Sequence, residues 1–247
     1  MADGGMQLGL QLIVWGQRRA NDRAAVLAEA AAAGYAGVEL SPPADGEVDA
    51  ALAELRENGL RVVASHIGTG ALATDLDRHL RWLEKTGARF LACSGQDYPT
   101  SAQYRAVARS LDEAGARCRA NGITLCYHNH AHEIVHDLFG LGHILRNTDP
   151  QNVHLNLDTY WVQRGGQDPV AIIRLLGERI GYLHLKDMLA DGSFGEIGAG
   201  RLDWDGIRQA AVDLRLPLVV VEQDRTARTP LESSEMSRRY LREHWGL

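Results

Sequence analysis

The sequence predicts an α/β protein folded as a single (β/α)8 TIM barrel over residues 1–247. Short runs rich in leucine and β-branched residues alternate with longer amphipathic stretches rich in alanine and arginine, which is typical of repeated βα units and a parallel sheet. Eight such units can be counted, and 247 residues is close to the roughly 250 of a one-domain barrel. No linker or low-complexity tract divides the chain, so one domain is the economical interpretation.

The strands follow one another at regular intervals along the chain. They are expected at residues 7–14, 35–40, 60–66, 88–94, 123–129, 153–158, 181–186 and 217–222. A helical segment follows each strand and is shorter after the fifth. Gly34, Gly59, Gly87 and Gly122 each stand where a helix ends and the next strand begins, and glycine there supplies a left-handed turn. Residues 1–5 are expected to form a loose N-terminal tail.

An open doubly wound sheet is the structural alternative, and it would usually show a glycine-rich phosphate loop after an early strand. The sequence has only the short pairs Gly68-Thr69-Gly70 and Gly198-Ala199-Gly200, which lack the further glycine spacing of that motif. These pairs are better interpreted as flexible loops over a pocket.

The composition limits the kinds of molecule that the protein is expected to bind. The formal net charge of −6 gives no basic surface for nucleic acid, so the expected partner is a small molecule. No apolar run approaches the ~20 residues of a membrane helix, and the N-terminal residues lack the pattern of a secretory signal, which predicts a cytoplasmic protein without membrane attachment. Cys93, Cys118 and Cys126 have no CxxC spacing and are expected to be core thiols.

Polar residues close several of the predicted strands, and the C-terminal ends of barrel strands are where active sites form. Strand three ends at His66, and strand five runs into Tyr127-His128-Asn129-His130, with Glu133 shortly after. The last three strands end in ionisable groups: Asp158 on the sixth, His184 and Lys186 on the seventh, and Glu222 on the eighth.

Alternation along the strands places these ionisable groups inside the barrel, because successive side chains point to opposite faces. Burial of such groups costs several kcal/mol unless they are paired or bound to a metal. Asp158, His184 and Glu222 together form an oxygen and nitrogen ligand set suited to one divalent ion, such as Mn, Mg, Co or Zn. The alternative is an internal ion-pair network of the same three side chains with Lys186.

Other candidates have two interpretations each. His128 and His130 share a strand face, which permits joint ligation, or one of them is a core imidazole. His66 either touches substrate or only bonds a neighbouring loop, whereas His132 and His136 are expected in an exposed loop. Trp15 and Trp161, taken to close strands one and six, suit the C–H face of a sugar ring or simply fill space. Glu39 is a candidate for binding the substrate or supporting the site, and Arg201 is a candidate for binding an anionic group of the substrate.

In these residues the chain resembles the xylose isomerase-like TIM-barrel superfamily, in its sugar phosphate isomerase/epimerase (AP endonuclease family 2-like) branch. The resemblance covers nearly the whole chain. Its carriers, in order, are the segments 33–40, 127–130 with Glu133, 157–161, 183–187, 198–200 with Asp203-Trp204, and 221–224.

The resemblance implies one divalent metal held by a Glu, an Asp, a His and a second Glu from strand ends five to eight. Asp158, His184 and Glu222 match three of these positions. Strand five closes on Tyr127-His128 where the family typically has a glutamate, so Glu133 is expected as the fourth ligand or as an acid/base, with His128 as the substitute ligand.

The expected function is therefore that of a metal-dependent sugar isomerase or epimerase acting on a keto-sugar or related polyol through an enediolate. Glu222 or Glu133 would act as base, while Lys186, His66 or His130 would stabilise the enediolate or return the proton. The alternatives are an inosose dehydratase-type lyase and a non-catalytic sugar-binding protein with a degenerate site. A nuclease of the endonuclease IV kind would need three metals and a basic groove. The negative net charge of the chain argues against this class. Family analogy alone suggests a homodimer.

Overall fold

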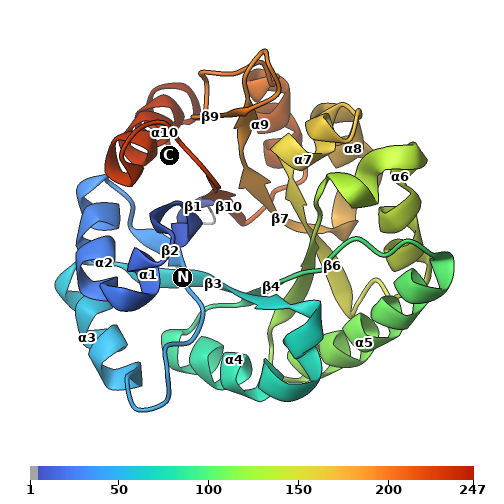
Figure 1. Ribbon diagram of the computed structural model, residues 1–247, viewed down its shortest axis with the longest axis horizontal. Coiled ribbons are helices and arrows are strands. Elements are labelled where there is room, and N and C mark those ends of the chain that lie inside the picture. The colour runs from blue at the N-terminus through green and yellow to red at the C-terminus, as the bar shows by residue number, and fades with distance from the viewer. Residues whose placement is uncertain (1–4) are drawn as a thin grey trace.

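The computed structural model describes residues 5–247, so the expected N-terminal tail lies almost wholly outside the described residues. Eight parallel strands close into a barrel in the order β1-β10-β7-β6-β5-β4-β3-β2. Figure 1 shows the ring of strands enclosed by a ring of helices. The predicted (β/α)8 TIM barrel is confirmed.

The barrel strands are β1 (Gln7–Gln11), β2 (Gly37–Glu39), β3 (Arg61–Gly68), β4 (Phe90–Ser94), β5 (Thr124–His128), β6 (Val153–Asp158), β7 (Ile180–Leu185) and β10 (Leu218–Val221). A small antiparallel pair, β8 (Asp187–Met188) and β9 (Phe194–Gly195), lies in the loop after β7. The α-helices are α1 (Arg18–Asn21), α2 (Arg23–Ala32), α3 (Val48–Glu57), α4 (Leu72–Thr86), α5 (Ser101–Ala120), α6 (Ala131–Arg146), α7 (Thr159–Arg164), α8 (Pro169–Leu176), α9 (Trp204–Asp213) and α10 (Pro230–Trp245). Three 3-10 helices complete the described chain: η1 (Leu12–Trp15), η2 (Thr69–Ala71) and η3 (Gly177–Arg179).

Seven strands lie where the sequence predicts them, but the first is shorter than expected. β1 ends at Gln11, and the next four residues form η1. The side chain of Gln11 accepts a hydrogen bond from the backbone N–H of Ile13 at 2.8 Å and so starts this helical turn. Trp15 therefore does not close a strand, which corrects the prediction.

The helix after the fifth strand also differs from expectation. α6 begins at Ala131, so His132 lies in its first turn instead of a loop. His136, Asp137 and Leu138 have φ angles between 54° and 62° and interrupt the helix with a kink. His136 is exposed at this kink, as expected for a loop residue. Gly34, Gly59, Gly87 and Gly122, which the sequence predicts at helix ends, all have positive φ.

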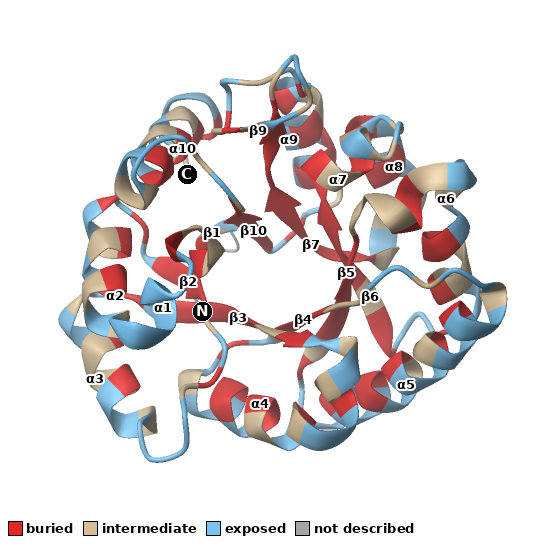
Figure 2. Ribbon diagram, in the orientation of Figure 1, coloured by how far each residue is buried: buried red, intermediate tan, exposed pale blue. Residues whose placement is uncertain are grey.

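The core has two parts. A large cluster lies between the strands and the helices, and Figure 2 shows the strands and the inward sides of the helices as buried. A smaller cluster fills the interior of the barrel with Val63, Ala64, Ala92, Cys126, Tyr182, Leu218 and Val220, against which Phe90 packs. Cys93, Cys118 and Cys126 are buried free thiols, as predicted. The barrel interior is thus apolar below the level at which the polar strand ends begin.

Within the described residues, every helix is too short or too polar to cross a bilayer.

Candidate metal centre

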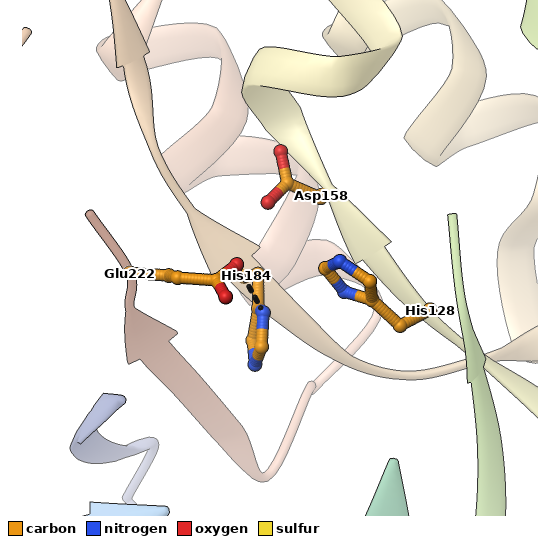
Figure 3. Close-up of side chains that lie close together, drawn as sticks. All are labelled: His128, Asp158, His184 and Glu222. Carbon is orange, nitrogen blue, oxygen red and sulfur yellow. Dashed lines mark hydrogen bonds and ion pairs between the residues drawn. The ribbon is translucent and has the colours of Figure 1, made fainter. Parts of the chain in front are cut away.

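Four buried side chains converge at the C-terminal mouth of the barrel (Figure 3). They are His128 at the end of β5, Asp158 at the end of β6, His184 in β7 and Glu222 directly after β10. Each offers one ligand atom, and these atoms all lie within 4.8 Å of one another. We call these four residues the mouth group.

The strand register explains this convergence. Asp158 pairs with His184 between β6 and β7, and Val220 pairs with His184 between β7 and β10. His128 lies opposite Asn156, two residues before Asp158 and so on the same face of β6. Neighbouring parallel strands therefore deliver one ligand each to the same level of the barrel.

His184 is held on both sides by carboxylates. Its Nε2 lies 3.0 Å from Glu39 Oε2, and its Nδ1 lies 2.9 Å from Glu222 Oε2. Burial alone would lower the pKa of His184, but Glu39 and Glu222 raise it to about 10. In the same pair, burial would raise the pKa of Glu39, but His184 and His66 hold it at about 2. A carboxylate on the far nitrogen of a histidine is the arrangement that orients metal-binding imidazoles.

Glu39 has further partners that fix its position. Its Oε2 accepts a hydrogen bond from the hydroxyl of Tyr182 at 2.8 Å, and its Oε1 lies 3.1 Å from His66 Nδ1. His66 Nε2 in turn lies 2.9 Å from the hydroxyl of Ser94. Glu39 therefore links His184 of the mouth group to Tyr182 and His66.

Lys186 makes the ion pairs that the sequence offered as the alternative to a metal. Its Nζ lies 2.7 Å from Asp224 Oδ2, 3.0 Å from Glu222 Oε2 and 3.3 Å from Asp158 Oδ2. Burial would lower the pKa of Lys186, but these carboxylates raise it above its ordinary value. The lysine therefore stays charged, and the structure contains the ion-pair network that the sequence offered as an alternative.

The network nevertheless leaves negative charge uncompensated. Four carboxylates, on Glu39, Asp158, Glu222 and Asp224, face two cationic groups, on His184 and Lys186. Asp158 Oδ2 is buried and accepts no hydrogen bond from residues 5–247, and burial raises the pKa of this carboxyl to about 7 despite Lys186. A divalent cation would offset this excess charge, and two imidazoles with two carboxylates form a ligand set that such ions use. The mouth group could therefore hold a metal ion.

Glu133, expected as the fourth ligand, lies outside the mouth group. Its Oε1 accepts a hydrogen bond from Tyr127 at 2.6 Å and lies 2.8 Å from His132 Nε2, while its Oε2 accepts the backbone N–H of His130 at 2.8 Å. As the third residue of α6, it turns its carboxylate back to the start of its own helix. His130, His132 and Glu133 form a second cluster of candidate ligands, which we call the helix group.

A cavity of about 530 Å³ opens over the mouth group. Its walls include Glu39, His66, His128, His130, Trp161, Glu222 and Asp224. His130 Nδ1 is buried without a hydrogen-bond partner, and Trp161 stands beside Lys186, whose Nζ lies 5.3 Å from the indole centroid. Four of the residues predicted to meet substrate, His66, His130, Trp161 and Glu39, thus line one cavity.

Two other predicted substrate contacts lie elsewhere. Trp15 is buried away from the cavity and donates its indole N–H to Glu29 Oε2 at 2.6 Å. Arg201 is exposed in the loop before α9 and is not among the residues that line the cavity. Trp15 ends the 3-10 helix after β1 and Arg201 belongs to the loop before α9, so neither is among the residues that line this cavity.

Sequence reasoning also overlooked residues that line the cavity. Gln11 and Ser94 end β1 and β4 and face the cavity, and Asp224 pairs with Lys186 at its wall. Ser94 could have been found from the rule that strand ends carry the site, whereas Gln11 was hidden by the overlong first strand. Asp224 was visible in the alternation after the last strand.

The fold and the mouth group define a (β/α)8-barrel protein with a candidate divalent-metal centre at its C-terminal mouth. The sequence model of the xylose isomerase-like TIM barrel matches residues 27–244, and the chain belongs to this family. The resemblance inferred from the sequence is thereby confirmed.

Individual proteins of known sequence or structure are similar to this chain over 90% or more of its length. An inosose dehydratase of Mesomycoplasma hyopneumoniae (strain 7448) is 26% identical, over 90% of this chain and 87% of its own length. The structure of a sugar phosphate isomerase/epimerase from Parabacteroides distasonis ATCC 8503 superposes with a TM-score of 0.77 at 24% identity, over 98% of this chain and 96% of that one. The structure of an L-ribulose 3-epimerase gives a TM-score of 0.77 at 19% identity, over 96% and 93%.

Proposed function

We propose that the chain is a divalent-metal-dependent isomerase or epimerase that moves a proton next to the carbonyl of a keto-sugar or related polyol. The observation that carries this proposal is the convergence of His128, Asp158, His184 and Glu222 at the barrel mouth, where His128 and Glu222 line an open cavity and Lys186 lies beside Glu222. These four residues would hold the ion. When bound, a divalent ion polarises a carbonyl and a neighbouring hydroxyl, which acidifies the adjacent C–H bond.

The carboxylate that takes the proton must face the cavity. Glu222 and Asp224 do so, whereas Glu133 is not among the lining residues and has its oxygens engaged by its own helix and by Tyr127. We therefore assign proton removal to Glu222 or Asp224 and a positioning role to Glu133, which fixes the segment that presents His130.

The remaining roles in the proposed reaction fall to Lys186 and to aromatic side chains that line the cavity. Lys186 remains charged among its carboxylates, so it suits the stabilisation of negative charge on the enediolate oxygen better than proton donation. Burial lowers the pKa of His130, so this imidazole, which lines the cavity, would be a neutral group able to bond a substrate hydroxyl. Trp161 offers an aromatic face for the C–H side of the sugar, and His66 offers an imidazole held by Glu39 and Ser94.

One intermediate leads to three products. Return of the proton to the opposite face of the same carbon gives an epimer, and return to the neighbouring carbon gives an isomer. Loss of the β-hydroxyl as water gives a dehydrated product. The sequence similarity to inosose dehydratases favours this last reaction as the second candidate function.

The test is hydrogen exchange in deuterated water. The metal-loaded protein is incubated with a panel of keto-sugars and inososes, and C–H exchange is followed by NMR. Exchange with epimer or isomer formation is the expected result. Accumulation of an enol-derived dione assigns the protein to the lyases instead. Absence of exchange with every member, with sugar binding retained, leaves a non-catalytic sugar-binding protein.

The two candidate bases can be separated in the same assay. Glu222→Gln and Asp224→Asn are compared after their metal content has been matched to that of the wild type. Loss of exchange in only one of them identifies the base, and full exchange in both contradicts the assignment.

A further inference from the structure

The end of β5 carries an imidazole where a carboxylate would give a different kind of metal centre. His128 is 2% exposed, and its ring centroid lies 4.8 Å from that of His184. Two of the four donors of the mouth group are therefore nitrogens and two are oxygens.

His128 differs from the neighbouring histidines in its bonding. His66, His132 and His184 each lie within 3.1 Å of a carboxylate oxygen, whereas the one hydrogen bond recorded for His128 in the described chain joins its Nδ1 to Asn156 Nδ2 at 3.4 Å. No ion pair therefore competes with a metal for the other ring nitrogen, Nε2. The burial of His128 is not explained by charge neutralisation.

Asn156 is placed to orient this ring. It is fully buried, and its Oδ1 has no hydrogen-bond partner among the residues that the structure describes. The two ends of an amide are interchangeable in position, and a rotation of 180° would bring Oδ1 to His128 Nδ1. The oxygen would then accept the Nδ1 proton and leave the lone pair of Nε2 free for a metal. A hydrogen bond on one ring nitrogen that fixes the other for ligation is the usual support of a metal-binding histidine.

We infer that His128, held by Asn156, makes the mouth group selective for a borderline transition-metal ion of the zinc class over Mg²⁺ and Mn²⁺. This inference rests on the metal centre of the proposed function. Imidazole suits zinc and its neighbours, whereas all-oxygen surroundings suit magnesium and manganese. The four ligand atoms lie within 4.8 Å of one another, so one ion could contact both imidazoles together with the two carboxylates.

The experiment compares metal affinities and needs no substrate. Metal-free wild type, His128→Glu and His128→Gln are titrated with Zn²⁺ and with Mn²⁺ against a competing chromophoric chelator. The ratio of the two affinities is the quantity of interest, because most protein sites bind zinc more tightly than manganese in absolute terms. Circular dichroism checks that each variant is folded.

The expected result is a change in that ratio. His128→Glu should lower the zinc-to-manganese affinity ratio by at least about tenfold, because it replaces a nitrogen donor by an oxygen. His128→Gln should weaken zinc binding without strengthening manganese binding. Asn156→Leu keeps the donor but removes its orienting partner and should weaken zinc binding by roughly 10- to 100-fold.

Two outcomes overturn the inference, and they are distinguishable. If His128→Glu tightens both metals equally, added charge and not donor type governs the site, and only the selectivity is wrong. If neither the wild type nor any folded variant binds a divalent ion, the metal centre of the proposed function fails and the selectivity fails with it.

Discussion

The mouth group and the helix group both contain histidines and a buried glutamate, and they differ in how far the protein itself already uses their ligand atoms. In the helix group, Tyr127, His130 N–H and His132 surround the carboxylate of Glu133. In the mouth group, Asp158 Oδ2 accepts no hydrogen bond within the described chain, and carboxylates outnumber cationic groups. The Glu133 carboxylate is engaged by its own helix and by Tyr127 and so holds a loop in place, whereas the mouth group has spare negative charge and is prepared for a ligand.

The first test of this comparison removes the carboxylate of Asp158 from the mouth group. Asp158→Ala should weaken divalent-metal binding more than roughly a hundredfold, because loss of a ligand costs more than loss of an outer partner. Isothermal titration calorimetry with Zn²⁺ measures the change. Unaltered affinity in the folded variant would show that the mouth group does not hold the ion.

The matched change in the helix group should spare the metal and affect the fold. Glu133→Ala leaves the Tyr127 hydroxyl and the His130 N–H without their acceptor, so the free energy of unfolding should fall by about 2–4 kcal/mol. Glu133→Gln retains one acceptor oxygen and should cost less. Denaturant unfolding measures both variants, and a loss of bound metal in folded Glu133→Gln would contradict the division between the two groups.

Proton release sharpens the comparison further, since metals bind only the deprotonated forms of their ligands. The pKa of His184 is near 10 and that of Asp158 is near 7. Between pH 7 and 10 only His184 of this pair is protonated, so metal binding should release one proton. Below pH 7 Asp158 is protonated as well, so metal binding should release two. Apparent affinity should therefore rise with pH, by about tenfold per unit for each proton released. Calorimetry in buffers of different ionisation enthalpy counts these protons, and binding without proton release would be inconsistent with the ionised pair.

The smallest effect is expected from His132. Its side chain is partly exposed, and its one ion pair in the described chain is with Glu133, so His132→Ala should change the free energy of unfolding by less than about 1 kcal/mol. Zinc affinity should stay at the wild-type value. A clear loss of zinc binding in this variant would place the ion in the helix group.

Sequence reasoning reached the barrel and most of the site because both follow from periodicity. Alternation along β6 and β7 is a local property, and it correctly placed Asp158, His184 and Lys186 on the inner face. The rule that parallel strands end at one edge then brought Glu222 to the same point.

What sequence could not give depends on turns and on side-chain direction. The 3-10 turn after Gln11 removed Trp15 from the strand, and the start of α6 decided that Glu133 bonds its own helix while His128 joins the mouth group. Both outcomes rest on hydrogen bonds of a few residues, which leave no periodic signal. The partners of Glu39, on β1, β3 and β7, likewise appear only once the barrel closes.

The most direct test of the central claim is anomalous diffraction from crystals of the zinc-loaded protein, recorded at the zinc absorption edge. One strong peak per chain is expected between His128, Asp158, His184 and Glu222, with metal–ligand distances of about 2.0–2.2 Å. A peak between His130, His132 and Glu133, or no ordered peak at the mouth, would contradict it.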